Sequence, residues 1–148
     1  MNTLIDQRVE LARNGENPTV LCRMPSGWAV LGDAQFIPGY ALLLPDPVVP
    51  DLNALSPDER KQYLYDMTLI GDALLEVTDA YRINYETLGN TDPALHTHIF
   101  PRYLSEPEEY RKGPVYYYPR ELRNSRPFDP ERDKEFMEQL AEAVRRRL

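Results

Sequence analysis

The chain has 148 residues, 42% of them hydrophobic, and a formal net charge of -7 at pH 7. This length suits one folded domain, and the apolar fraction is ordinary for a globular protein. The negative charge argues against duplex nucleic acid as the main partner, because such binding relies on clustered Lys and Arg. Binding of a small charged ligand is compatible with this charge, since local hydrogen-bond donors decide it.

The single cysteine, Cys22, cannot form an intramolecular disulfide, and its apolar neighbours favour a core thiol over a nucleophile. No apolar stretch reaches the length that spans a membrane, and residues 1–8 lack a basic start followed by an apolar run. We therefore expect a cytoplasmic protein with no membrane partner.

The first half of the chain predicts one helix and three strands. Helical spacing of apolar residues predicts a helix over 4–12, ended by Asn14-Gly15. Residues 20–24 and 28–31 are expected to form a hairpin, and 40–44 a third strand.

The clearest helix start is Ser56-Pro57-Asp58-Glu59, with a capping serine, a proline at the first helical position and a glutamate three residues after the cap. It predicts a packed central helix over about 57–78. The core-facing stripe of this helix is expected to contain Leu64, Met67, Gly71, Leu74 and Thr78, with Tyr63 or Tyr65 as an extension.

Residues 82–88 predict a strand by their β-branched and aromatic content. Its Asn84 has two open interpretations: an amide that binds a phosphate or ribose, or a buried amide that ties down a loop.

The last third changes composition to charge, proline and tyrosine. Residues 103–127 predict a long ordered loop or wrapping arm. Its tyrosines either pack within the domain, stack on a base or contact a partner subunit. A final helix is expected from Asp129-Pro130, with Phe136, Leu140 and Val144 on one face. We expect one domain over 1–148, with 104–148 as a C-terminal extension.

Both histidines of the chain, His96 and His98, lie in the segment 94–102. If 94–100 is a strand, the two-residue side-chain period places both imidazoles on one face, together with Ala94 and Phe100.

Three interpretations of this pair are open. The rings can be ordinary strand side chains satisfied by hydrogen bonds. They can ligate zinc or iron, although a third ligand is normally needed and no further histidine exists. They can also serve nucleophilic catalysis, in which a neutral imidazole attacks phosphorus and a neighbouring donor steadies the phosphoryl oxygens.

The segment resembles the signature of the histidine triad (HIT) family of nucleotide hydrolases and transferases, in which three histidines alternate with apolar residues, often before Pro-Arg. Residues 94–102 match except at the first histidine. Upstream, Gly89-Asn90-Thr91 is similar to the family's loop of a glycine, an amide and a Ser or Thr, and 37–45 to its Pro-Gly-His turn and following strand. The resemblance covers about 20–103.

The resemblance implies an α+β fold, with an antiparallel sheet of about five strands, a packed central helix and terminal helices. It also implies a homodimer and a reaction that needs no metal or other cofactor. The expected substrates are dinucleoside polyphosphates, nucleoside phosphoramidates or similar compounds.

The resemblance also implies roles for site residues. His96 would attack the α-phosphorus to form a nucleotidyl-histidine, and His98 would donate to the phosphoryl oxygens. Three loop residues would bind the other oxygens: Gly89, Asn90 and Thr91. Asp33 lies near the position that contacts ribose hydroxyls in the family, and a simple turn-forming aspartate is an equal alternative.

Two departures from the family pattern concern activity. Ala94 replaces the first histidine, although the backbone carbonyl that orients the central ring in the family survives this change. Tyr40 and Asp46 stand where many members carry further histidines. The chain is therefore expected to be an enzyme of this type or, alternatively, a nucleotide-binding or interaction protein that has lost turnover.

Overall fold

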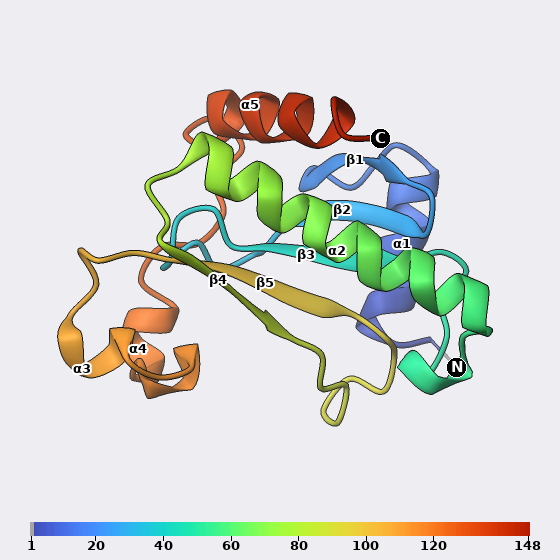
Figure 1. The fold of residues 1–148 in the computed structure, drawn as a ribbon, viewed down its shortest axis with the longest axis horizontal. Coiled ribbons are helices and arrows are strands. Elements are labelled where there is room, and N and C mark those ends of the chain that lie inside the picture. Colours follow the sequence, from blue (N-terminus) through green and yellow to red (C-terminus); the bar gives the residue numbers. More distant parts are fainter. Residues whose placement is uncertain (1) are drawn as a thin grey trace.

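The five strands of the protein form one antiparallel sheet in the order β1-β2-β3-β5-β4, in a computed structural model that describes residues 2–148 (Figure 1). The strands are β1 (Val20–Met24), β2 (Gly27–Leu31), β3 (Ala41–Pro45), β4 (Arg82–Glu86) and β5 (Thr97–Arg102). The longer helices are α1 (Leu4–Arg13), α2 (Pro57–Val77) and α5 (Lys134–Arg145). The predicted α+β fold with about five strands is confirmed.

Helices cover both faces of this sheet (Figure 1). Helices α2 and α5 pack on one face, against alternate strand residues such as Leu43 and Ile99. Helix α1 packs on the other face, where Ile5 and Val9 contact Leu44. Because side chains alternate along a strand, His98 points to the face that carries α1.

Helix α2 starts as predicted, with a capping box between Ser56 and Glu59. The predicted core stripe is partly wrong. Leu64 is 37% exposed and does not belong to the buried face. Of the two tyrosines expected to extend the stripe, Tyr65 is 58% exposed, whereas Tyr63 is 1% exposed and its hydroxyl lies 2.8 Å from Thr97 Oγ1. The buried face of α2 is centred on Tyr63 and Ile70, because the sheet and α5 together cover it.

The histidine strand begins later than predicted, at Thr97. Strand β3 pairs with β5 only from Thr97 onward, and the Leu95 amide donates instead to the Val49 carbonyl. The final helix also begins later, at Lys134, because the Asp129 carboxylate accepts from the Glu131 and Arg132 amides and forms a separate turn.

The segment after β5 is an ordered arm, as predicted, and it contains three short helical turns: α3 (Glu108–Arg111), η2 (Val115–Tyr117) and α4 (Arg120–Arg123). Its anchor is Arg102, which is 1% exposed and donates to Glu106 and to the carbonyls of Tyr110 and Gly113. Tyr118 is buried in the arm, whereas Tyr117 is 59% exposed. Within residues 2–148 no helix is long and apolar enough to cross a membrane.

Candidate active site

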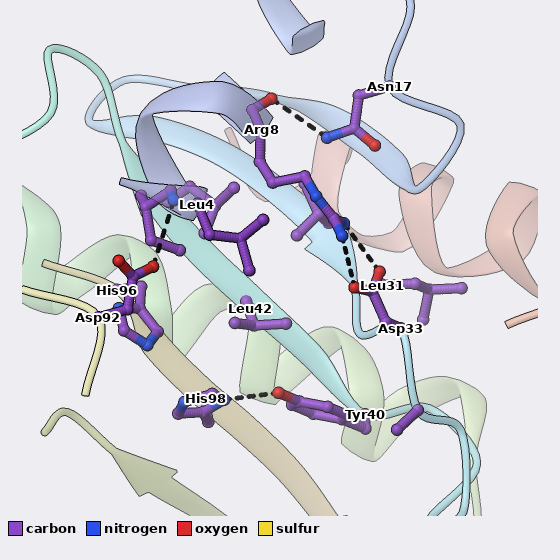
Figure 2. A pocket seen from close by; sticks show the side chains of 14 residues that line it. Leu4, Arg8, Asn17, Leu31, Asp33, Tyr40, Leu42, Asp92, His96 and His98 are labelled. Carbon is purple, nitrogen blue, oxygen red and sulfur yellow. Dashed lines mark hydrogen bonds and ion pairs between the residues drawn. The ribbon is translucent and has the colours of Figure 1, made fainter. Parts of the chain in front are cut away.

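The two histidines lie side by side on the sheet face that carries α1 (Figure 2). His96 immediately precedes β5 and His98 lies in it, and their ring centroids are 4.9 Å apart. Both rings line a cavity of about 250 Å³ between the sheet and α1. The predicted arrangement, with both imidazoles on one face, is confirmed.

The ring of His96 is oriented by the backbone carbonyl of Ala94, which lies 2.8 Å from Nδ1. A carbonyl oxygen can only accept, so Nδ1 carries the proton and Nε2 of the neutral ring keeps its lone pair. The Ala94 methyl group is buried in a cluster with Ile5 and Leu44. The backbone therefore orients His96 without a histidine at position 94.

The ring of His98 is held by Tyr40, whose hydroxyl lies 2.5 Å from Nδ1. Burial raises the pKa of Tyr40, so the hydroxyl keeps its proton and can donate it to Nδ1. Burial, with a smaller contribution from His96, lowers the pKa of His98 to about 4. At neutral pH His98 is then an uncharged ring whose Nε2–H is a free donor.

Most of the remaining lining of the cavity is apolar and forms a slot, with a charged pair at one side. Both terminal guanidinium nitrogens of Arg8, in α1, donate hydrogen bonds to the carboxylate oxygens of Asp33, at 2.8 and 2.7 Å. The structure therefore brings the predicted Asp33 into the cavity of the histidines. Sequence reasoning missed Arg8, although its helical spacing from Ile5 places it on the sheet-facing side of α1. The apolar lining is Leu4, Ile5, Val30, Leu31, Leu42 and Leu44.

A second missed residue is Asp92, which lines the same cavity (Figure 2). Its carboxylate accepts from the Ile5 amide in the first turn of α1, at 3.3 Å. The partner amide is 87 residues away in the chain, so no local signal predicts this contact. A carboxylate at this position opposes the approach of an anionic phosphate.

The predicted phosphate loop lies beside His96 rather than inside this cavity. Gly89 and Asn90 line a second cavity of about 440 Å³, which also reaches His96. Gly89 has a φ of 75°, a conformation that favours glycine. Thr91 lines neither of these two cavities.

The structure does not bring Asn84 to the histidine cavity. Its side-chain oxygen accepts from Arg102 at 2.7 Å, so the amide helps to hold the arm. The register of β4 places Asn84 opposite Phe100 and Glu86 opposite His98. Glu86 is partly buried, and this burial raises its pKa. Of the two interpretations of Asn84, the structure supports the structural one.

No group of three or more His, Cys, Asp or Glu side chains within residues 2–148 is arranged to hold a metal ion. Asp46, which stands where many family members have a histidine, accepts from Arg13 and from Trp28 Nε1. It ties the end of α1 to β2 and is outside the histidine cavity.

Comparisons with known proteins agree with this architecture. A family model described as the HIT domain matches residues 15–104. A histidine triad protein from Sinorhizobium meliloti is 23% identical, with a TM-score of 0.72 over 90% of this chain and 93% of its own. One from Marinobacter aquaeolei is 20% identical, with a TM-score of 0.72 over 86% and 88%.

A third solved structure, a hypothetical histidine triad nucleotide-binding protein from Sulfolobus tokodaii, is 12% identical, with a TM-score of 0.72. That match covers 95% of this chain and 92% of the other. At these identities the likeness shows a shared fold. No curated protein matches the chain significantly.

Proposed function

The chain belongs to the histidine triad (HIT) family, and on that premise we propose that it binds a nucleotide in the histidine cavity and splits it at the α-phosphorus. The substrates are dinucleoside polyphosphates or nucleoside phosphoramidates. The observation that carries the proposal is the fixed and complementary state of the two rings: His96 presents a free lone pair, and His98 presents an N–H donor.

In the first step, Nε2 of His96 attacks the α-phosphorus, and a P–N bond forms as the bond to the leaving group breaks. The leaving group takes the electron pair of that bond and a proton from solvent. His98 Nε2–H donates to a non-bridging oxygen, where negative charge increases in the transition state. Because the pKa of His98 is lowered to about 4, the ring that donates this hydrogen bond is uncharged at neutral pH.

In the second step, water or another acceptor attacks the phosphorus of the nucleotidyl-histidine. The P–N bond breaks, its electron pair returns to His96 Nε2, and an attacking water releases one proton to solvent. Asp33 and the apolar slot hold the nucleoside, and groups of Gly89 and Asn90, which line the cavity next to His96, are proposed to bind phosphoryl oxygens. A water acceptor makes the protein a hydrolase; a second nucleotide or phosphate makes it a transferase.

A second candidate function, nucleotide binding without turnover, is favoured by Asp92. Its carboxylate lines the cavity of both imidazoles, so it repels the extra negative charge that develops on phosphoryl oxygens during attack. Such repulsion weakens binding of a phosphate less than it slows its conversion.

One experiment separates the two functions. Dinucleoside polyphosphates and adenosine phosphoramidates are incubated with native protein and with His96→Ala, with and without chelator, and products are separated by chromatography. Protein quenched in alkali is examined by mass spectrometry for a nucleotidyl group on His96, because this P–N bond is acid-labile. His98→Gln, which keeps the nucleophile, is the matched variant.

Turnover that is lost in His96→Ala, slowed in His98→Gln and unaffected by chelator supports the enzyme. Binding of nucleotide by native protein without product or adduct supports the second candidate function, nucleotide binding without turnover. Turnover that survives His96→Ala contradicts the covalent mechanism.

We further propose that the chain folds as one domain over 1–148 and pairs as a homodimer through α2 and the edge strand β4. Tyr65, Leu75 and Tyr85 leave 58%, 45% and 37% of their surface exposed on these two elements. Strand β4 pairs only with β5 in the described sheet. Sedimentation of native protein and of Tyr65→Glu tests the dimer: a native monomer refutes it.

A further inference from the structure

The ion pair between Arg8 and Asp33 lies in the wall of the cavity, away from the two histidines (Figure 2). In this view Leu42 lies between the pair and the rings. The apolar slot leads from the rings toward this pair, so it offers space beside the pair for the sugar and base of a nucleotide whose phosphorus contacts His96. Arg8 is the one lysine or arginine that lines this cavity within residues 2–148.

The geometry of the pair constrains Asp33 closely. The two terminal nitrogens of Arg8 each reach a different carboxylate oxygen, at 2.8 and 2.7 Å. This two-point contact fixes the plane of the carboxylate, which a single-point contact does not. The Asp33 side chain is still 58% exposed, so the pair does not close it off from a ligand.

Each carboxylate oxygen can accept a further hydrogen bond beyond the one from Arg8. A ribose presents two neighbouring hydroxyl donors, and a carboxylate of fixed orientation can accept from both. A 2′-deoxyribose presents one donor fewer. The contact with Arg8 also offsets the charge of Asp33, which would otherwise repel the phosphate of the ligand.

We propose that Arg8 is a positioning residue that holds Asp33 to recognise the ribose diol, so that the site selects ribonucleotides over 2′-deoxyribonucleotides. This inference rests on the nucleotide site proposed above. The contact of Asp33 with ribose hydroxyls is what the family resemblance implies, and the new element is Arg8, a side chain of α1 that acts through Asp33.

A purely structural role for Arg8, as a tie between α1 and the sheet, is the competing explanation. The chain offers a matched control on the same helix. Arg13 makes an ion pair with Asp46, which ties α1 to the sheet but does not line the cavity. Replacing Arg13 therefore removes one such tie without touching Asp33.

The test measures dissociation constants of ribonucleoside monophosphates and their 2′-deoxy counterparts by calorimetry, for native protein, Arg8→Gln, Asp33→Ala, the double variant and Arg13→Gln. Melting temperatures are measured in parallel. The readout is the ratio of the two constants, because a charge effect of Arg8 on the phosphate acts equally on both sugars and cancels.

We expect native protein and Arg13→Gln to prefer the ribonucleotide by about tenfold or more, the value of one hydrogen bond to a charged group. Arg8→Gln, Asp33→Ala and the double variant should all bind both sugars within about twofold, since the two residues act as a unit. Loss of the preference in Arg13→Gln, or its survival in Arg8→Gln, overturns the inference.

The binding data for native protein separate failure of this inference from failure of the proposed function. Native protein that binds both sugars equally overturns the role of Arg8 and leaves the proposed function intact. Native protein that binds no nucleotide overturns the proposed function and this inference with it.

Discussion

Replacing His98 with glutamine should flatten the pH dependence of stability in mild acid. Burial, with a smaller contribution from His96, lowers the pKa of His98 from 6.5 to about 4. In the unfolded chain this ring titrates near its ordinary value. Between these two pKa values the unfolded state binds more protons than the folded state, so the stability that neutral His98 contributes is complete above pH 6.5 and lost toward pH 4.

The size of the effect follows from the two pKa values. Their difference of about 2.5 corresponds to ~3 kcal/mol of unfolding free energy. Urea unfolding can be followed by the fluorescence of Trp28, the one tryptophan of the chain. From pH 6.5 to pH 4, native protein should lose about 3 kcal/mol more than His98→Gln does. Carboxylates that titrate in this range are present in both proteins and cancel in the comparison.

Glu86 needs its own control, because it lies opposite His98 in the β4–β5 register and burial raises its pKa. The comparison is therefore repeated in Glu86→Gln, where the His98-dependent difference should persist. Equal slopes for native protein and His98→Gln would refute the reasoning. A His98 ring signal that titrates near its ordinary pKa by NMR would refute it independently.

Three further substitutions test single contacts. Tyr40→Phe removes the hydroxyl that donates to His98 and should lower turnover about tenfold or more in initial-rate assays; unchanged rates would show that the tautomer is held otherwise. Ala94→His, which restores the family residue, should cost about 1–3 kcal/mol in urea unfolding, because position 94 is 2% exposed; a more stable variant would contradict this packing. Arg102→Met should cost about 3–5 kcal/mol by leaving the carboxylate of Glu106 without its charged partner, with Arg102→Lys less affected in thermal unfolding; equal losses would argue against the ion pair.

Predictions from the sequence succeeded where the signal is local. The capping box at Ser56 specifies the start of α2 through side chains within three residues. The two imidazoles, two residues apart, lie on one face as the alternation predicted, although the strand itself begins only at Thr97, and the carbonyl of Ala94 orients His96. Each of these features is decided by residues a few positions apart.

Predictions failed where packing or strand pairing decides. The stripe through Leu64 is as regular as the one through Tyr63, and only the position of α5 and the sheet selects which is buried. The β4–β5 pairing brings Asn84 beside Arg102 instead of into the cavity. In the sequence, Arg102 stood out only as part of the Pro-Arg of the family signature, whereas in the structure its guanidinium donates to carbonyls of the arm.

The family, the α+β class and the two candidate catalytic rings could be identified from the sequence, because the motif and the periodic patterns lie within short segments. The surroundings of the rings depend on contacts between distant parts of the chain. Tyr40 meets His98 across 58 residues, Arg8 meets Asp33 across 25 residues, and Asp92 accepts from the first turn of α1. Such contacts depend on strand register and on how a helix docks against the sheet, and no local pattern carries that information.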